Sequence, residues 1–419
     1  MIKILDKHAK ILEQESEIPL EIQQKAFDIV CDVKENGDKA LFEMAKIYDH
    51  VELKSLEVSE DEMKVAYQQT DKEFLKVIEK AKNNIEDFHK HQLSNNFIVE
   101  KDGILLGQRT TPIERIGIYV PGGRALYPST VLMNVIPAKI AGCEYICLTT
   151  PPTSDGSICN EILAISYMLG VDKVFKIGGA GAIAALAYGT ETVKPVYKIT
   201  GPGNAFVAAA KRIVFGKVGI DMIAGPSELL IIADQNQNPK FIAADMLSQA
   251  EHDSLARAIL LTTSQDLAQN VATEIDIQLE SLPKQEIARA SIENQSMIIV
   301  ADSLDECFEL SNGLAPEHLE IMLDNAIDYL SKIKNAGSIF LGSFTPEAVG
   351  DYLAGVNHTL PTNQTAKFSS ALSVESFVKK STFVRYNESS LKSDANDIIQ
   401  FARLEQLQAH ARSVECRFS

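Results

Sequence analysis

A carboxamide and an imidazole stand three residues apart in the stretch LSQAEHD, residues 247–253. If this stretch is helical, Gln249 and His252 share one face, because residues three apart on a helix are neighbours. Together with Asp351 and His410 they would supply nitrogen and oxygen donors without a thiolate, a set suited to Zn²⁺ or Mn²⁺ that leaves room for a substrate. A polar surface turn explains the same stretch without a metal, and most of these donors lie far apart in the sequence. The spacing alone therefore leaves both interpretations open.

A carboxylate and an imidazole are adjacent in GLAPEHLEIML, residues 313–323. Pro316 keeps the residue before it out of helical geometry, so we expect Glu317 and His318 in a turn just ahead of an apolar strand. Such a pair suits general acid–base catalysis, because the two pKa values can be tuned apart. Neighbours in an extended strand point to opposite faces, so both can serve one site only if the turn persists through them. A solvated turn is the alternative interpretation.

Two glycine turns follow expected strands and open expected helices. KIGGAGAIAALAYG places Gly179, Gly181 and Ala184 in the GxGxxA spacing of a dinucleotide-binding loop, and in TGPGNAFV Asn204 can cap a helix. A helix N-terminus beside a tight turn favours a phosphate. No acidic residue is cleanly placed at the end of the next strand, so a turn that serves only packing remains an alternative.

Two more polar stretches lie near the end of the sequence. In GDYLAGVNHTLPT, Asp351 follows a glycine and His358 lies in a loop. In LEQLQAHARS, Glu405 and His410 are five positions apart, which puts them about 140° apart around an ideal helix. A site shared by these two side chains therefore requires a helix end or a distortion between them.

The elements that must position these residues alternate between short apolar runs and helical stretches. The runs occur in two sets, the first at 116–123, 145–152, 173–181 and 196–204, and the second at 229–234, 258–263, 296–302, 319–323 and 338–343. Strand, loop and helix repeated in this way are typical of parallel sheets with crossover helices. We expect an α/β fold with two Rossmann-like, doubly wound domains, N-terminal helices and a small C-terminal helical appendage.

The expected division of the chain has four segments. They are residues 1–115, N-terminal helices that join the first α/β domain; 116–228, an inserted Rossmann-like domain; 229–362, the remainder of the first domain; and 363–419, a small C-terminal segment. In the last segment we expect a strand pair, or a strand and a short helix, and then a helix of about 20 residues capped by Ser393 or Asp394. This segment is too small to bury a core alone, so it must pack on the body or on another subunit.

The composition excludes several classes of protein. The 419 residues carry a formal net charge of −17, which disfavours nucleic acid and anionic membranes as partners. No apolar run approaches the ~20 residues of a membrane span, and the first residues lack the apolar segment of a secretory signal, so we expect a cytoplasmic protein. The six cysteines are scattered without a CxxC pair, which gives no reason to expect a thiol nucleophile or a cysteine-bound zinc.

Several motifs of this chain together resemble one known family. They are IYVPGG, GGAGAIAALAYGTE, GPGNAFV, IDMIAGPSE, DMLSQAEHD, LAPEHLE, GDYLAGVNHTLPT and EQLQAHA. Their order and spacing are similar to those of histidinol dehydrogenases, from about residue 20 to residue 412. The resemblance implies NAD-dependent oxidation of L-histidinol to L-histidine through an aldehyde, the last steps of histidine biosynthesis, with two NAD⁺ per substrate.

The resemblance also implies roles for individual residues. Gln249, His252, Asp351 and His410 match the ligands of one zinc per subunit, with His410 supplied by the partner subunit of a homodimer that shares its active site. Glu317 and His318 match the catalytic pair, in which Glu317 activates water and His318 serves as acid and base. The positions that match substrate contacts are Ser227, Gln249, His252, His318, Asp351, Glu405 and His410, with His358 close by.

Tyr119 and Asn204 match contacts to NAD. The sequence departs from the family pattern GGAQA at Gly181, where a glutamine side chain that would contact the cofactor is absent. NAD is therefore expected to bind more weakly or to be held differently there.

Three other functions stay open at this point. A metal-dependent hydrolase could use Glu317 and His318 on a metal-activated water. An oligomeric binding protein could retain a vestigial site, and an NAD-dependent dehydrogenase of a related amino alcohol would keep the same fold. Formation of NADH separates the dehydrogenases from the hydrolase.

Overall fold

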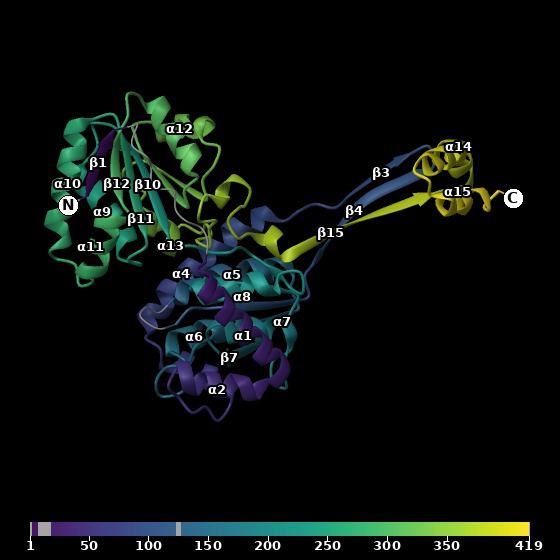
Figure 1. The fold of residues 1–419 in the computed structure, drawn as a ribbon, viewed down its shortest axis with the longest axis horizontal. Coiled ribbons are helices and arrows are strands. Elements are labelled where there is room, and N and C mark those ends of the chain that lie inside the picture. Colours follow the sequence, from purple (N-terminus) through teal and green to yellow (C-terminus); the bar gives the residue numbers. More distant parts are fainter. Residues whose placement is uncertain (1, 7–17, 123–126, 419) are drawn as a thin grey trace. The chain divides into compact units, whose positions relative to one another are not determined.

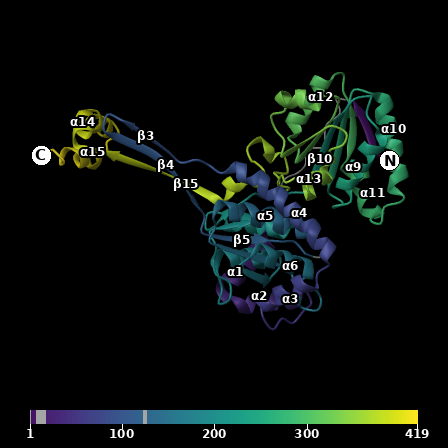
Figure 2. The same ribbon diagram turned by 180° about the vertical axis from the view of Figure 1, so that it is seen from behind.

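The computed structural model describes residues 2–6, 18–122 and 127–418, which form two compact units (Figures 1 and 2). Unit 1 consists of Met1–Gln92 and Ile113–Phe377, and unit 2 of Leu93–Pro112 and Val378–Ser419. In the described ranges no helix is both long and apolar enough to span a bilayer.

Six parallel strands form the first sheet of unit 1, here called sheet A. In spatial order they are β1 (Lys3–Asp6), β12 (Met297–Val300), β11 (Arg257–Thr262), β10 (Glu228–Ala233), β13 (His318–Met322) and β14 (Ser338–Leu341). Every residue of β10 and β11 is buried, as expected for a parallel sheet covered by helices on both faces. Leu229 and Ile231 enter the core on one face, and Leu230 and Ile232 the core on the other.

Helices cover both faces of sheet A. They are α9 (Pro239–Ala250), α10 (Gln265–Leu279), α11 (Gln285–Asn294), α12 (Leu304–Leu314) and α13 (Glu347–Tyr352), with the 3₁₀ turn η2 (Ala326–Lys332). Two further 3₁₀ turns follow, η3 (Thr365–Lys367) and η4 (Val374–Phe377), and Phe377 of η4 lies in a different core, together with Ile118. Helices α9 to α11 contribute to the core that contains Leu229, and α12 to the core that contains Leu230.

The second sheet of unit 1, sheet B, also has six strands. Their order is β2 (Glu57–Val58), β7 (Lys173–Lys176), β6 (Tyr145–Thr150), β5 (Arg115–Tyr119), β8 (Lys198–Thr200) and β9 (Gly219–Ile220). All neighbours are parallel except β2, which pairs antiparallel with β7. The two sheets confirm the expected α/β fold with Rossmann-like halves.

The helices around sheet B include most of the N-terminal ones. They are α1 (Leu20–Asn36), α2 (Asp38–Tyr48), α3 (Glu60–Gln69), α4 (Lys72–His89) with the 3₁₀ turn η1 (Lys90–Gln92), α5 (Pro128–Ala141), α6 (Asn160–Leu169), α7 (Gly179–Tyr188) and α8 (Ala205–Val214). Val30 and Leu41 share a core with Tyr119, and Met63 and Ile78 share one with Ile118.

This packing differs from the expected grouping of residues 1–115 with 229–362. The apolar stripes of α1 to α4 pack on the core of sheet B. Among the described elements before β5, only strand β1 joins sheet A. An amphipathic stripe shows that a helix has a buried face, but it does not name the sheet that buries it. The division into four segments with the stated boundaries stays a prediction.

Unit 2 is built on a three-stranded antiparallel sheet. Strands β3 (Phe97–Lys101), β4 (Ile104–Pro112) and β15 (Val378–Tyr386) are followed by helices α14 (Glu388–Leu404) and α15 (Gln408–Glu415). The expected cap at Ser393 or Asp394 is wrong, because Asn387 accepts the Ser390 N–H at 2.8 Å and starts α14 earlier. The appendage also takes in β3 and β4, whose sequence lies far from the C-terminal segment.

Candidate active site and metal centre

Glu317 and His318 lie at the amino-terminal edge of sheet A. His318 is the first residue of β13 and lies opposite Leu229, the second residue of β10. The preceding α12 ends at Leu314, and its C-cap Ala315 lies in the left-handed region, at φ 48° and ψ 61°, as expected for a residue barred from helical geometry by Pro316. The expected turn is confirmed for Glu317, but it is wrong for His318, which already belongs to β13.

The backbone of one neighbour, Glu228, holds the imidazole of His318. The Nδ1 atom of His318 lies 3.0 Å from the carbonyl oxygen of Glu228, so in the neutral ring Nδ1 carries the proton and donates it. The Nε2 atom is then the basic atom, and it is buried without a hydrogen-bond partner among the residues that the structure describes. A buried acceptor left unsatisfied is costly unless a ligand fills its place, so we interpret Nε2 as directed at a substrate.

Glu317 is held by the same neighbour and is buried beside His318. Its Oε2 accepts the Glu228 N–H at 2.9 Å and lies 3.7 Å from His318 Nδ1. Burial raises the pKa of Glu317 to about 8, the imidazole of His318 lowers it, and the carboxylates of Glu347 and Glu228 raise it further. A carboxyl with a pKa near neutral pH can both accept and return a proton.

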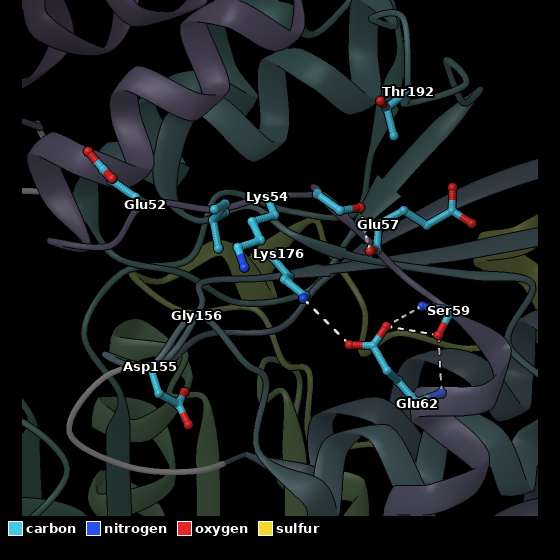
Figure 3. A pocket seen from close by; sticks show the side chains of 11 residues that line it. Glu52, Lys54, Glu57, Ser59, Glu62, Asp155, Gly156, Lys176 and Thr192 are labelled. Atoms are coloured by element: carbon cyan, nitrogen blue, oxygen red, sulfur yellow. Dashed lines mark hydrogen bonds and ion pairs between the residues drawn. The ribbon is translucent and has the colours of Figure 1, made fainter.

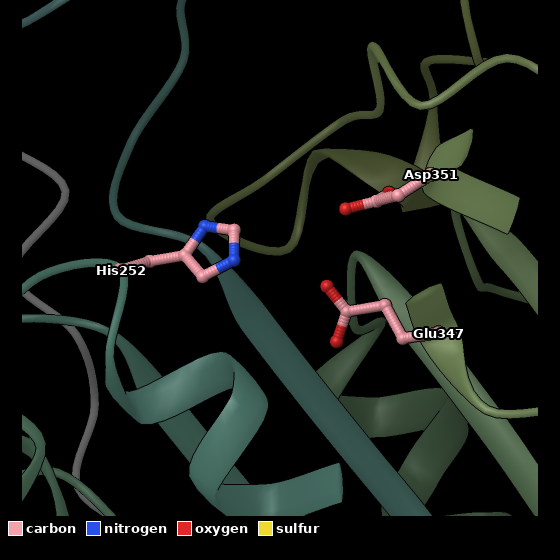
Figure 4. Close-up of side chains that lie close together, drawn as sticks. All are labelled: His252, Glu347 and Asp351. Carbon is pink, nitrogen blue, oxygen red and sulfur yellow. The ribbon is translucent and has the colours of Figure 1, made fainter. Parts of the chain in front are cut away.

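Three side chains form a cluster that could hold a cation. The ligand atoms of His252, Glu347 and Asp351 all lie within 4.8 Å of one another, and Figure 4 shows the imidazole and both carboxylates pointing toward a common space. Glu347 and Asp351 are the first and fifth residues of α13, so the helix presents them on one face. Glu347 is not among the residues expected from the sequence, although its i, i+4 spacing to Asp351 could have indicated that the two carboxylates share a helix face.

Gln249 joins this cluster through Glu347. With its amide nitrogen toward Glu347, the Gln249 side chain donates to both carboxylate oxygens at 3.0 Å. Gln249 lies in the last turn of α9, which ends at Ala250, so His252 lies in the turn after the helix and not on the helical face that we expected. Its backbone N–H still donates to the Gln249 carbonyl at 3.3 Å, which keeps the two residues together.

The charges of this cluster fit a divalent cation. Burial raises the pKa of Glu347 well above its usual range, and the carboxylates of Asp351 and Asp245 raise it further. Desolvation of the imidazole by the surrounding protein lowers the pKa of His252, although the residue as a whole is exposed. Metal ligation needs the neutral imidazole, which a lowered pKa favours. A dication among these donors would offset the carboxylate charges, and imidazole, carboxylate and carboxamide donors suit zinc.

Ser227 lies beside the residue that holds the catalytic pair, and His358 lies near the cluster. The Ser227 carbonyl accepts the Arg257 N–H at 3.0 Å, and Ser227 precedes Glu228, which holds the catalytic pair. His358 Nδ1 is 3.9 Å from Asp351 Oδ1, and burial lowers the pKa of its ring. Of the expected substrate contacts in unit 1, the structure thus brings together His252, Asp351, Gln249 and His318 through Glu347.

The other two expected site residues, Glu405 and His410, belong to unit 2, where both are exposed. Helix α14 ends at Leu404, Gln406 has a φ of 63°, and α15 begins at Gln408. The single final helix that we expected is therefore two helices, and the helix end between Glu405 and His410 is what a shared site requires. Their part in the site stays a prediction.

The residues expected to contact NAD lie at the carboxyl edge of sheet B. Tyr119 ends β5, and its buried hydroxyl accepts the N–H of Gly179, the first residue of α7, at 3.2 Å. Asn204 caps α8 by accepting from Phe206 N–H at 3.0 Å and Val207 N–H at 3.2 Å. Ligands of open α/β sheets bind at this edge, next to helix N-termini.

Gly181 lies inside α7 and faces α2. A Cβ atom there would lie 3.0 Å from the Met44 sulfur, so the position is filled by packing between two helices. The absence of a glutamine side chain at this position therefore leaves the turn before α7 intact.

A polar pocket of about 760 Å³ opens beside the same edge (Figure 3). It is lined by Glu52, Leu53, Lys54, Ser55, Glu57, Ser59, Glu62, Asp155, Gly156, Lys176 and Thr192. Lys176, at the end of β7, forms an ion pair with Glu62 at 3.7 Å, and Glu62 completes the capping box of α3 with Ser59. These contacts give the lysine and the carboxylate structural roles in the pocket wall.

Contacts between side chains and backbone join the two halves of unit 1 near the cluster. Burial raises the pKa of Tyr127, which precedes α5, and the carboxylate of Asp253, the neighbour of His252, raises it further. The Asn84 side chain of α4 donates to the Leu353 carbonyl just after α13 at 2.7 Å. The segment before α5 and helix α4 therefore lie near the segments that carry His252 and Asp351.

Comparisons with known proteins agree with this geometry. The family model described as histidinol dehydrogenase matches residues 12–418. The chain is 52% identical over 391 residues to a histidinol dehydrogenase of Clostridium acetobutylicum, covering 93% of this chain and 91% of the relative. It is 52% identical over 398 residues to one from Geobacillus kaustophilus, covering 95% and 94%. The crystal structure of histidinol dehydrogenase from Elizabethkingia anophelis is similar with a TM-score of 0.95 and 41% identity, over 99% of this chain and 98% of that one.

Proposed function

Because the chain belongs to the histidinol dehydrogenase family, we propose that it oxidises L-histidinol to L-histidine with NAD⁺, as the last steps of histidine biosynthesis. The observation that carries this proposal is the buried His318 Nε2, which has no partner among the described residues, next to Glu317 and within the cluster of metal donors. The comparisons support an NAD-dependent oxidoreductase, and the geometry supports the roles of individual residues.

His318 is proposed to take the proton from the substrate alcohol in the first oxidation. Its Nδ1–H is fixed on the Glu228 carbonyl, so Nε2 presents its lone pair without a change of tautomer. The imidazole can then pass the proton on or return it in the next step.

Glu317 is proposed to activate the water that adds to the aldehyde. Its carboxyl lies beside His318, and the pKa of about 8 gives a carboxylate that binds a proton readily near neutral pH. Addition of water gives a hydrate whose C–H hydrogen can leave as a hydride in the second oxidation. No cysteine nucleophile is required for this route.

The zinc is proposed to be held by Gln249, His252 and Asp351, with His410 of the partner subunit as a further ligand. When bound, one zinc per subunit would hold the substrate and stabilise negative charge on its oxygen. Gln249 can present its carboxamide oxygen to such an ion while its nitrogen donates to Glu347.

NAD is proposed to bind at the carboxyl edge of sheet B, in contact with Tyr119 and Asn204, and NAD⁺ accepts the hydride in each oxidation. The capped N-terminus of α8 and the turn before α7 provide the anion-binding geometry. Substrate contacts are proposed for Ser227, Glu405 and the ligand-bearing residues.

A homodimer with a shared active site is proposed to complete this arrangement. Unit 2 exposes apolar side chains on its strands and helices, namely Phe97, Ile98, Val99, Leu106, Val384, Phe401 and Leu404. So many exposed apolar side chains on a small unit support an interface with another subunit. The proposed partner is a second copy, with neither nucleic acid nor membrane involved, and a soluble cytoplasmic enzyme is the proposed setting.

The decisive experiment measures NADH formed from L-histidinol, NAD⁺ and added Zn²⁺ by the wild type and by His252→Ala and Glu317→Gln. We expect two NADH per histidinol from the wild type and failure of both variants to reach that yield, with none from His252→Ala and at most one from Glu317→Gln, which keeps the first oxidation. A wild type that holds one zinc per chain but forms no NADH would overturn the proposal in favour of a hydrolase or a vestigial site. NADH with other amino alcohols, but not with L-histidinol, would reassign the substrate.

A further inference from the structure

An ion pair lies completely buried behind the turn that connects β8 to α8. Lys211, on α8, and Asp221, directly after β9, have side chains only 2% and 1% exposed, and Nζ lies 2.6 Å from Oδ1. Neither residue belongs to the metal cluster or to the catalytic pair.

This ion pair forms hydrogen bonds with both backbone groups, the N–H and the carbonyl, of one glycine in the turn. Lys211 Nζ donates to the Gly201 carbonyl at 2.5 Å, and the Gly201 N–H donates to Asp221 Oδ2 at 2.8 Å. The ion pair and the glycine thus form a closed set of three contacts. The turn cannot rotate about Gly201 without breaking at least one charged hydrogen bond.

No other residue type fits at the position of Gly201. Its φ is 111°, and a Cβ atom there would clash with the Tyr119 carbonyl oxygen. The turn therefore rests on the backbone at the end of β5 and leads three residues later to Asn204, the cap of α8. Holding Gly201 fixes the relation between Tyr119 and Asn204, the two residues proposed to contact NAD.

Stability alone does not account for the pair. Two apolar side chains of similar volume often serve a core as well as a buried ion pair, because the pair must give up its hydration. Here the charged groups bond to a backbone that apolar side chains could not hold. We propose that Lys211 and Asp221 are positioning residues for the dinucleotide, an inference that rests on the proposed use of NAD.

The test compares the wild type with the double variant Lys211→Met/Asp221→Leu, which removes both charges of the pair together. NADH affinity is measured by fluorescence titration of the zinc-loaded protein, and L-histidinol affinity by calorimetry without cofactor. We expect the Kd for NADH to rise between about tenfold and 100-fold, because a displaced turn misplaces the cofactor. Zinc content and the Kd for L-histidinol should stay within about twofold, a split that general loss of structure would not produce.

Two controls accompany this variant. Arg212→Met alters the next, exposed residue of α8 and should leave the NADH affinity unchanged, and Lys211→Arg keeps a cation and should restore most of it. If the double variant does not fold, the isosteric Asp221→Asn takes its place. A folded variant with the wild-type Kd for NADH would overturn the positioning role even if the wild type oxidises L-histidinol. A wild type that binds no NADH would overturn the proposed function itself.

Discussion

Glu228 holds both members of the catalytic pair through its backbone alone. Its N–H donates to Glu317 and its carbonyl accepts from His318, so the two side chains converge although they are neighbours in sequence. The side chain of Glu228 is itself buried: burial raises its pKa to about 7, and Arg257 lowers it. A substitution of Glu228 would therefore disturb the site mainly through local charge, because any residue supplies the same backbone groups.

Replacement of Glu317 by glutamine is expected to stabilise the fold at mildly alkaline pH. Burial raises the pKa of the folded carboxyl from 4.5 to about 8, so between these values the folded state binds more protons than the unfolded one. The wild type therefore loses free energy of unfolding as the pH rises through this window. A glutamine side chain does not titrate, so Glu317→Gln removes this loss. Urea unfolding at pH 5 and pH 8 measures the difference.

The pKa values of the neighbouring Glu228 and Glu347 are raised as well, but both residues are common to the two proteins, so their direct contributions largely cancel in the comparison. Glu309→Gln, at an exposed position of α12, is the matched control and should show no such gain. An equal effect of Glu317→Gln at both pH values would contradict the assigned protonation.

Substitutions of the two catalytic residues should affect the two oxidations differently. Reduction of L-histidinal by NADH reverses only the first oxidation and needs no water, so Glu317→Gln should retain it while losing histidine formation by about 10²–10⁴-fold. His318→Gln should lose both by a similar factor, because Nε2 handles the alcohol proton. Stopped-flow absorbance of NADH distinguishes the two variants, and loss of both activities in Glu317→Gln would reject the division of roles.

At the scale of elements, the short helix α13 carries two carboxylates into the metal cluster. Its first N–H, from Glu347, donates to Glu320 Oε1 at 2.8 Å, which fixes the start of the helix to β13. The helix thus connects the cluster to the strand that begins with His318. A substitution in α13 should therefore change the affinity for the metal more than it changes the stability of the fold.

Glu347→Ala is expected to weaken zinc binding by about 10–100-fold, because it removes the carboxylate that orients Gln249. Metal content after dialysis against a graded chelator measures the effect. Val349→Ala, a partly exposed position on the same helix, is the control. Unchanged zinc affinity of Glu347→Ala would remove Glu347 from the site.

The sequence predicted the strands and turns far better than it predicted which elements meet. The apolar runs identified nine of the twelve strands described in sheets A and B and missed the short strands β1, β2 and β9. Pro316 identified the turn before His318, because this signal, like an apolar run, is local. The packing of α1 to α4 on sheet B, the pairing of β4 with β15 and the approach of Glu347 to Gln249 depend on contacts between distant residues. The roles of Glu317, His318 and the proposed zinc ligands came from the family resemblance, since no periodicity relates Asp351 to His252.

At the scale of the whole molecule, an active site shared between two subunits predicts that dimers of two different inactive variants regain activity. His252→Ala and His410→Ala should each be inactive alone. A mixed dimer would hold one site with His252 of one chain and His410 of the other, so random mixing in equal amounts should restore about a quarter of the wild-type activity. Co-expression with two affinity tags, followed by an NADH assay, measures this. No recovery in the isolated mixed dimer would mean that His410 acts within its own chain or not at all.

The pairing of β1 with β12 has a consequence for how the protein is made. Lys3 lies opposite Met297, so the first of the described strands to leave the ribosome waits for a partner that is synthesised nearly 300 residues later. At the ~5–20 residues per second of translation, this delay is roughly 15–60 s, during which the segments of sheet B have all emerged. Sheet B can therefore assemble before sheet A, which closes only once β12 and β14 have been made. Until then β1 lacks its partner strand and is open to chaperones that bind nascent chains.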